Sequence, residues 1–257
     1  MSFIKFDEDK NAIINPSVFA EKNNTKIKNC PKTMITCFSK KLIDYAVEKY
    51  NAKEITKIGG ANGKRPVYLI ETYGKSMGLF MSSVGAPCCV GDYEDLFEIG
   101  VENIVVFGTC GVLENSIKEN SIIIPTSAVR EEGTSFHYVE PSEEIDVNIN
   151  TFEKMKEFFS EFNYTSGKVW TTDAIYRETL GKFQYMKEKG CICVDMECSA
   201  ISAVSKFRNK RVAQFFYAAD NLDNENYDLR TLGCDITLDE KYKIVDIAIN
   251  LGIYLFE

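Results

Sequence analysis

The chain has 257 residues, of which 45% are hydrophobic and 26% charged, and its formal net charge at pH 7 is -8. This length suits one large α/β domain or two small ones, and the composition is that of an ordinary soluble globular protein. The acidic balance argues against a nucleic-acid partner, which would need a basic face. It leaves room for a small anionic substrate that a local cluster of donors could bind.

Cysteine and histidine usage limits the chemistry available to the chain. The nine cysteines include no CxxC pair and several lie in apolar runs, so we interpret them as reduced thiols in a cytosol. The start, MSFIKFDEDKN, has no apolar region typical of a signal peptide, and no stretch approaches the ~20 apolar residues of a membrane span. Because His137 is the only histidine and no cysteine set has ligand spacing, we expect no metal.

The first half of the chain predicts an arm and then a group of strands. Residues 1–33 are polar and weakly patterned, and we expect an irregular N-terminal arm. Met34–Phe38 predicts a strand, and a helix is expected from Ser39 to Tyr50. Turns rich in glycine then separate three further strands, which together indicate an antiparallel meander. These strands are Ile55–Ile58, Val67–Glu71 and Leu79–Ser83.

The second half alternates strands and helices. Pro87 suits the first turn of a helix that runs to about Glu98, and Asn103–Gly111 is apolar enough for a central parallel strand. Further strands are expected at Ser121–Val129, Gly167–Trp170, Cys191–Val194 and Val212–Ala219, and further helices at Val147–Phe162, from Met196 to Phe207, and from Thr237, where Glu240 completes a capping box. With no long linker, this order predicts one α/β domain at residues 34–257, a large mixed central sheet flanked by helices.

One corner of this chain carries two carboxylates. Asp195 and Glu197 flank Met196 where a buried strand becomes a helix. Ionised carboxylates only accept hydrogen bonds, so the pair is suited to binding hydroxyl groups. The alternative is structural: Asp195 would cap the helix and Glu197 would favour its first turn.

Other expected strand ends also carry polar residues or a glycine: Gly85, Thr109, Arg130, Thr172 with Asp173, and Asp220. Ligands of open α/β sheets bind at the carboxyl edge of the sheet, so this set indicates a pocket there. Gly85 would let the backbone pass close to a small ligand, and the following helix would offer free N–H groups to an anion. A simple strand-to-helix turn is the alternative at Gly85.

Six motifs in this order and spacing resemble the nucleoside phosphorylase family, which includes uridine phosphorylases, hexameric purine nucleoside phosphorylases and related nucleosidases. They are SSVGAP at Ser82–Pro87, FGTCG at Phe107–Gly111, VREEGTSFHY at Val129–Tyr138, TTDAIY at Thr171–Tyr176, VDMECSA at Val194–Ala200 and AAD at Ala218–Asp220. The resemblance covers roughly residues 34–255. It implies cleavage of the bond between ribose C1′ and the base, with phosphate as co-substrate and no other cofactor. It also implies a homodimer or a hexamer that is a trimer of dimers.

The resemblance implies roles at the sugar and phosphate. Glu197 would bind the ribose 2′- and 3′-hydroxyls, Met196 would pack on the sugar, and Asp195 would assist near it. Thr109 and the N–H groups around Gly85 and Gly108 would hold phosphate.

The resemblance also implies roles at the base. Thr172 and Tyr176 would shape the base pocket, and Ile175 stands where several relatives stack an aromatic ring on the base. Arg177 is a candidate for contacting the base. Asp220 matches the acid of the purine enzymes, which protonates or hydrogen-bonds N7 of the leaving base.

The sequence departs from the family at the phosphate site. Val106 stands where the family often has an arginine, and the N-terminal Gly-Asp-Pro-x-x-Arg motif is missing. Arg130, Lys64 with Arg65, or a neighbouring subunit would then supply the positive charge, because bidentate arginine contacts bind phosphate strongly. For Arg130 the alternative is a surface ion pair with the glutamates that follow it.

Three functions therefore stay open: a phosphorylase, a nucleosidase that uses water, and a binding protein without turnover. Asp220 favours a purine base, whereas the TTDAIYRET and REEGTS stretches resemble the uridine-type branch. A catalytic triad through Ser135 and His137 is a weaker rival. The two would share a face if their segment were a strand, but nothing in the sequence supplies an acid to orient the histidine.

Overall fold

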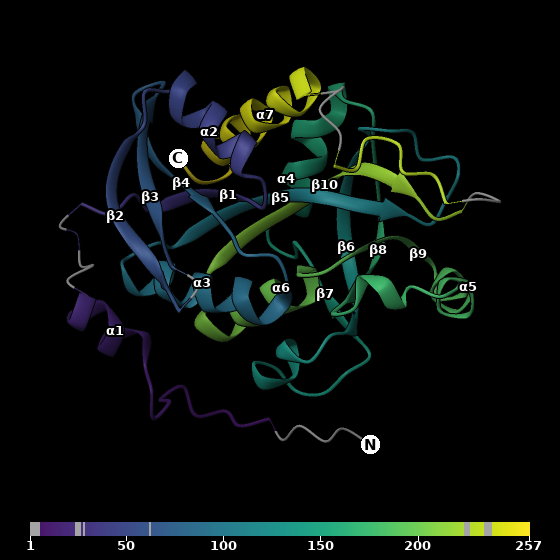
Figure 1. Ribbon diagram of the computed structural model, residues 1–257, viewed down its shortest axis with the longest axis horizontal. Coiled ribbons are helices and arrows are strands. Elements are labelled where there is room, and N and C mark those ends of the chain that lie inside the picture. Colours follow the sequence, from purple (N-terminus) through teal and green to yellow (C-terminus); the bar gives the residue numbers. More distant parts are fainter. Residues whose placement is uncertain (1–5, 24–26, 28, 62, 224–226, 234–237) are drawn as a thin grey trace.

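A mixed β-sheet forms the centre of the structure, and helices cover both of its faces (Figure 1). The computed structural model describes residues 6–23, 27, 29–61, 63–223, 227–233 and 238–257. Within these residues the ten strands are β1 Thr33–Cys37, β2 Lys53–Gly60, β3 Gly63–Thr72, β4 Lys75–Met81, β5 Asn103–Val112, β6 Ile122–Glu131, β7 Glu144–Asp146, β8 Tyr164–Thr172, β9 Cys191–Asp195 and β10 Arg211–Asn221. The helices are α1 Pro16–Asn23, α2 Lys40–Lys49, α3 Ala86–Glu98, α4 Phe152–Phe158, α5 Leu180–Glu188, α6 Cys198–Arg208 and α7 Leu238–Phe256, with short 3-10 segments η1 Thr134–His137, η2 Phe159–Glu161 and η3 Ile175–Arg177.

The sheet closes on itself at one end. Its strand order is β10-β6-β8-β9-β5-β1-β4-β3-β2, β7 pairs with β6, and β10 also pairs with β5. Five strands, β5, β9, β8, β6 and β10, therefore form a ring, and β1, β4, β3 and β2 extend the sheet from β5. The predicted meander is confirmed, since β2, β3 and β4 pair antiparallel. The predicted α/β fold with a large mixed sheet is confirmed as well.

The central strand β5 is buried on both faces, as its apolar sequence predicts. Val105 and Phe107 pack into the apolar layer beneath α2, α4 and α7. Ile104 and Val106 point the other way and pack with α3 and α6, because successive side chains of a strand alternate between faces. Val106, at the position where the family often has arginine, is therefore a core residue, only 3% exposed.

The helix predicted for Val147–Phe162 is shorter in the structure. It begins at Phe152, as α4, and ends in the 3-10 segment η2. Asn148 explains the late start: its backbone has φ +57°, and its side chain bonds the backbone of two strands. The amide donates to the carbonyls of Pro125 (3.0 Å) and Gln214 (2.8 Å) and accepts from the Gln214 N–H. A residue held in this way cannot continue a right-handed helix.

The N-terminal arm is more ordered than its composition predicts. The prediction of an irregular segment is wrong for α1, which begins at Pro16, a residue suited to the first turn of a helix. Arg208 of α6 donates to the carbonyl of Lys10 at 3.2 Å and so holds the arm to the body of the protein. At the other end of the chain, α7 begins at Leu238 within the described residues, and the predicted capping residue Thr237 lies outside them.

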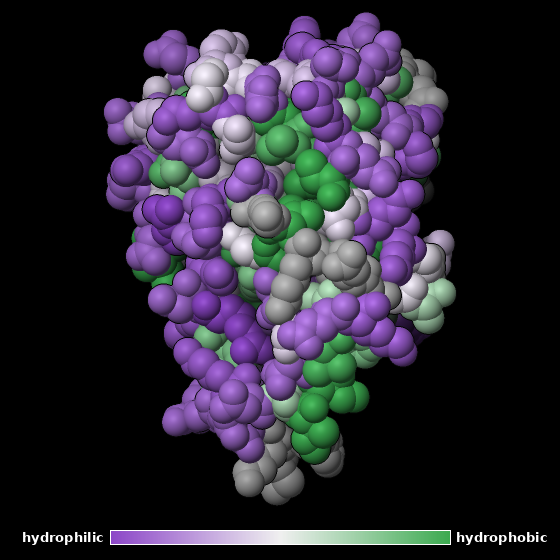
Figure 2. Space-filling model, turned by 90° about the vertical axis from the view of Figure 1, so that its left-hand side faces the viewer, coloured by the Kyte–Doolittle hydropathy of each residue, from purple (hydrophilic) through white to green (hydrophobic). Residues whose placement is uncertain are grey.

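The side of the molecule that carries β2 and α1 shows a band of apolar side chains between polar margins (Figure 2). Near α1 the exposed apolar side chains are Ile13, Ile14, Val18 and Phe19. Among the described residues, no helix is both long and apolar enough for a membrane crossing. The eight cysteines that the structure describes are free thiols.

Candidate functional site

A cavity of about 750 Å³ lies where β5, β9 and β10 end. Its volume is in the range of small-molecule sites, ~300–1,000 Å³. Its wall includes seven of the residues that the sequence predicts for the site: Thr109, Ile175, Tyr176, Asp195, Met196, Glu197 and Asp220. The prediction of a pocket at this edge of the sheet is therefore matched by the geometry.

The strand pairing explains why residues far apart in sequence meet here. β5 and β9 overlap only at their carboxyl ends, where Gly111 pairs with Val194 and Val112 with Cys193. β10 runs parallel to β5, and Asp220 lies opposite Gly111. The last residues of three strands therefore border the same space. Thr109 is the exposed member of an otherwise buried β5, and it lines the cavity.

Asp195 organises the corner between β9 and α6. One oxygen accepts from the hydroxyl of Thr171 (2.7 Å), and the other accepts from the backbone N–H groups of Glu197 (2.9 Å) and Cys198 (2.7 Å). The capping interpretation of Asp195 thus describes its contacts, and it explains why α6 begins at Cys198, two residues after the predicted start. Burial raises the pKa of this carboxyl, although these hydrogen bonds favour its charged form.

Glu197 directs its carboxylate toward the cavity from the first residue before α6. Its Oε1 accepts the backbone N–H of Gly85 at 2.6 Å. The side chain is almost wholly buried, and burial together with the nearby charge of Asp195 raises its pKa. Glu197 and Met196 both line the cavity.

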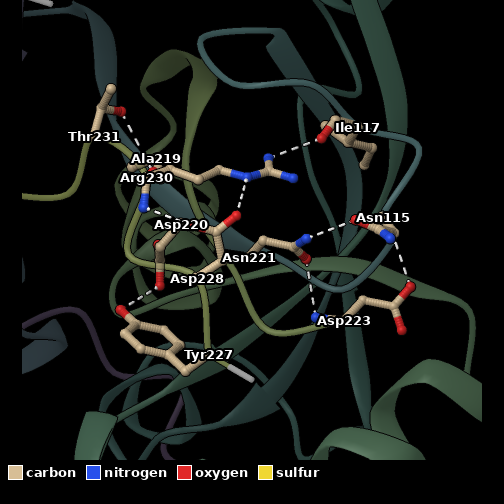
Figure 3. A network of polar contacts seen from close by, with 10 residues as sticks. All are labelled: Asn115, Ile117, Ala219, Asp220, Asn221, Asp223, Tyr227, Asp228, Arg230 and Thr231. Carbon is tan, nitrogen blue, oxygen red and sulfur yellow. Dashed lines mark hydrogen bonds and ion pairs between the residues drawn. The ribbon is translucent and has the colours of Figure 1, made fainter. Parts of the chain in front are cut away.

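Asp220 reaches the cavity because β10 contains a bulge. The register shifts between Ala218 and Asp220, so Ala219 is an extra residue in the strand. Bulges of this kind change the direction of the next side chain. The Ala219 carbonyl accepts from the N–H of Thr231 (3.0 Å), and Tyr227 donates its phenol to Asp220 Oδ2 (2.9 Å; Figure 3). Burial raises the pKa of Asp220, and the Tyr227 hydrogen bond opposes that rise.

The segment after β10 is held in place by its own polar network. Arg230 donates to the carbonyl of Ile117 (2.9 Å) and forms an ion pair with Asp228, while the side chain of Asn221 donates to Asn115 (2.8 Å; Figure 3). This network fixes the wall of the cavity that carries Tyr227.

Two polar residues of the cavity were not assigned by sequence reasoning. Glu178 and Tyr227 both line it, beside the apolar side chains Phe38, Val84, Leu180, Phe183, Leu222 and Leu232. Glu178 lies within the TTDAIYRET motif but follows η3, where no strand or helix pattern indicates its direction. Tyr227 follows Asp220 by seven residues in a segment without periodicity, so no pattern in the sequence points to it.

Some predicted base and phosphate residues are placed elsewhere. Of the described residues, Thr172, Arg177 and Gly108 lie outside the cavity lining. The Thr172 hydroxyl is buried and accepts the N–H of Ala174 at 3.3 Å, and Arg177 is exposed. The ring of Phe38 covers Gly108, since a methyl group there would lie 2.9 Å from its Cδ2. Their predicted roles stay predictions, and the N–H of Gly85 is engaged by Glu197.

Arg130 is a buried structural residue in this fold. Its Nε donates to the Ser135 hydroxyl (2.8 Å), and its terminal nitrogen donates to the Glu140 carbonyl and the Ser142 hydroxyl (both 2.8 Å). The guanidinium also lies 4.1 Å from the ring centre of Phe136. At 5% exposure it forms neither the predicted surface ion pair nor, among the described residues, a wall of the cavity.

The rival triad does not form. Thr134–His137 is a 3-10 segment rather than a strand, so Ser135 and His137 do not share a strand face. Ser135 is fully buried, and its oxygen accepts from Arg130. His137 is exposed. A serine in this position cannot attack a substrate in the cavity.

A second cavity of about 720 Å³ lies next to the first, with Phe38 and Val84 lining both. Its cationic wall residues are Lys57, Lys64 and Arg65. Arg65 forms a partly buried ion pair with Asp92 and donates to the Ser83 hydroxyl at 2.7 Å. Much of its charge is therefore already balanced. No group of three or more potential metal ligands lies together among the residues that the structure describes.

Together, the ring-closed mixed sheet and a carboxylate-lined cavity at its carboxyl edge define an α/β protein with a cavity of the size of small-molecule sites. A family model described as the phosphorylase superfamily matches residues 32–243, and the chain belongs to this superfamily. The predicted family resemblance is thereby confirmed.

Individual relatives are distant. The chain is 29% identical over 152 residues to the uncharacterized protein R802 of Acanthamoeba polyphaga mimivirus, covering 59% of this chain and 60% of that protein. It is 25% identical over 170 residues to a DeoD-type purine nucleoside phosphorylase of Brevibacillus brevis, covering 64% of this chain and 67% of the relative. The guanosine phosphorylase of Halorubrum lacusprofundi is 24% identical over 155 residues, 58% of this chain and 63% of that protein. The chain thus spans about three fifths to two thirds of the length of these curated relatives.

Solved structures support the fold over a longer span. A uridine phosphorylase from Vibrio fischeri ES114 superposes with a TM-score of 0.73 at 20% sequence identity, covering 90% of this chain and 94% of that chain. The topology is therefore shared even where the sequence has diverged.

Proposed function

We propose that the protein is a nucleoside phosphorylase, which cleaves the N-glycosidic bond of a purine nucleoside or uridine with phosphate and releases the free base and ribose 1-phosphate. One observation carries the proposal: a single cavity of nucleoside size brings Glu197, Met196 and Asp220 together from two separate strand ends. Membership of the phosphorylase superfamily supports it.

The proposed chemistry divides the cavity into a sugar side and a base side. Breaking the glycosidic bond builds positive charge on the ribose and negative charge on the leaving base. Glu197 accepts hydrogen bonds from the vicinal ribose hydroxyls and holds the sugar, with Met196 against it. Asp220, whose pKa is raised by burial, donates a proton or a hydrogen bond to the base as its negative charge grows.

Phosphate is placed beside Thr109 in this proposal. Its charge is balanced by the cationic wall of the adjoining cavity or by a second copy of the chain, since Arg130 is fully engaged elsewhere. We also propose that the protein uses no cofactor other than phosphate and that it forms a homo-oligomer, in line with the resemblance. In line with the free thiols, we propose that it is cytoplasmic. Light scattering of the purified protein tests the oligomeric state.

Hydrolysis is the second candidate, and a specific observation favours it. Val106 is a core residue at the position where the family often has its phosphate arginine, and the N–H of Gly85 is occupied by Glu197. A phosphate dianion would then have fewer strong donors than in its relatives. Water attacking ribose C1′ in the same cavity would release ribose in place of ribose 1-phosphate.

A panel of ribonucleosides assayed with and without phosphate tests both candidates. Base release that requires phosphate and yields ribose 1-phosphate supports the phosphorylase. Base release at an equal rate without phosphate, with free ribose as product, supports the nucleosidase. Calorimetric binding of nucleosides without any base release would contradict both and favour a binding protein.

A further inference from the structure

Glu178 is a carboxyl group in the cavity that the proposed mechanism does not use. It follows η3, precedes α5 and lines the same space as Asp220. The neighbouring side chains of its own segment, Leu180 and Phe183, are apolar. A carboxylate on an apolar wall is costly unless a ligand or a proton satisfies it.

Among the described residues, the charged and titratable groups around Glu178 provide no cation that pairs with it alone. Asp220 on β10 and Glu131 on β6 repel its charge, and Lys182 on α5 attracts it. Lys182 forms an ion pair with Glu131, which also accepts the indole N–H of Trp170 at 2.7 Å. On the segment after β10, Tyr227 interacts with Glu178 electrostatically but donates its hydrogen bond to Asp220.

These neighbours raise the pKa of Glu178 to about 7, chiefly through burial and then through the charge of Asp220. Above that pKa Glu178 is ionised and offers a ligand only hydrogen-bond acceptors.

We propose, as a refinement that rests on the nucleoside phosphorylase function, that Glu178 and Asp220 recognise the base together and select 6-aminopurine nucleosides. Adenine presents the N7 acceptor and the 6-amino donor side by side on one edge, whereas a 6-oxopurine presents two acceptors there. Ionised Glu178 accepts from the 6-amino group, while Asp220 contacts N7 as the proposed acid. A 6-oxopurine would place its oxygen against the Glu178 carboxylate, and two acceptors repel one another.

The proposal makes selectivity depend on pH. Below its pKa, Glu178 gains a proton and becomes a donor that a 6-oxo group can use. The preference for adenosine over inosine therefore weakens in acid. The contact of Asp220 with N7 is common to both nucleosides, so its own titration largely cancels in the ratio of their rates.

The test is the ratio of kcat/KM for adenosine to that for inosine, which differ at position 6 and in the proton on N1. The ratio is measured in phosphate at about pH 6 and about pH 8, on either side of the Glu178 pKa. For the native protein we expect adenosine to be favoured by roughly tenfold or more at the higher pH, and by clearly less at the lower pH. Glu178→Gln keeps the size of the side chain and offers both a donor and an acceptor, so the ratio should approach one and lose its pH dependence.

The matched control is Glu188→Gln, an exposed carboxylate at the end of α5, the helix that follows Glu178. It should follow the native protein at both pH values. A Glu178→Gln ratio within roughly twofold of the native ratio would overturn the proposal. So would a native preference for inosine at the higher pH, or cleavage of uridine with no binding of any purine.

Binding of the free bases separates this proposal from the function on which it rests. Calorimetry with adenine and with hypoxanthine needs no turnover. Selective binding of adenine that Glu178→Gln abolishes supports the base-recognition role even if no nucleoside is cleaved. Equal binding of both bases by the native protein counts against that role, even if nucleoside cleavage by phosphate is intact.

Discussion

The backbone N–H of Gly85 donates to the Glu197 carboxylate at 2.6 Å, which joins the starts of α3 and α6 across 112 residues of sequence. Gly85 makes this contact with φ +92° and ψ 135°, a conformation that other residues rarely adopt. The glycine expected to bring backbone close to a ligand thus positions the sugar-binding carboxylate of the proposed site.

Replacing Gly85 by alanine should lower both stability and activity. An added methyl group meets no atom within 4 Å, so the cost comes from the backbone conformation, roughly 1–3 kcal/mol. Urea denaturation measures the stability change, and kcat/KM for the best nucleoside measures the change at Glu197. Gly91→Ala, in the middle of α3 and also free of close contacts, is the control and should be neutral or stabilising. Equal behaviour of the two variants would contradict the role of the Gly85 conformation.

Glu197→Gln should stabilise the protein increasingly as the pH rises. The pKa of Glu197 is raised in the folded state, so the folded protein holds a proton that the unfolded chain releases above its ordinary glutamate range. The stability linked to that proton is fully present below the unfolded pKa and is lost as the pH rises toward the folded pKa. Glutamine carries no such cost. We expect the melting temperature of the variant to exceed that of the native protein by a few degrees in mild alkali and to match it near pH 4.

Two features make this stability measurement specific. Activity should fall in the same variant, because a neutral amide binds ribose hydroxyls less well than a carboxylate. Glu188→Gln, on the exposed surface, should show no pH-dependent difference. A constant difference in melting temperature across the pH range would argue that Glu197 titrates normally.

Asp220→Asn should reduce turnover of the base-releasing reaction by roughly a hundredfold, the usual contribution of a general acid. Tyr227→Phe is the informative partner variant. The Tyr227 hydroxyl stabilises ionised Asp220, so its removal raises the pKa of Asp220 further. The alkaline limb of the profile of kcat/KM against pH should then move to higher pH with only a modest loss of rate. An unchanged rate in Asp220→Asn would rule out the acid.

Arg130→Met should destabilise the protein without weakening phosphate binding. The arginine donates to Ser135, Glu140 and Ser142, and losing several charged hydrogen bonds costs roughly 2–5 kcal/mol. Thermal melting measures this cost, and KM for phosphate at a temperature where the variant is folded should stay near the native value. The exposed Arg177→Met serves as the control for charge removal. A large rise in KM for phosphate at unchanged stability would contradict this prediction and support a phosphate-binding role for Arg130.

The fold and part of the site follow from local patterns in the sequence. The apolar run of β5 and the turns of the β2–β4 meander are short-range signals, and the structure confirms them. The Asp195–Glu197 corner was also predictable, because a buried strand passes directly into a helix there. Asp195 makes capping contacts, and Glu197 lines the cavity, while the binding of hydroxyl groups by this corner stays a prediction.

The remaining features depend on contacts that no local pattern encodes. α5 has a single buried side chain, Met186, so it lacks the apolar periodicity that predicts a helix. Asn148 stops a helix because it bonds two distant strands, and Arg130 is withdrawn from the cavity by the loop at residues 134–142. Glu178 and Tyr227 meet Asp220 only after the sheet has closed. Tertiary contacts decided each of these cases.

The bulge at Ala219 adds one residue to β10 directly before Asp220, so the surroundings of the proposed acid depend on the geometry of the strand as well as on its side chains. Deleting Ala219 would restore the regular alternation of β10 while leaving every proposed functional side chain in the protein. Asp220 would stay opposite Gly111, but the Ala219 carbonyl that accepts the Thr231 N–H would be lost, and with it a contact that ties the segment after β10 to the strand. The position of the segment that carries Tyr227 therefore depends in part on one inserted alanine, through its backbone carbonyl and not through its methyl group.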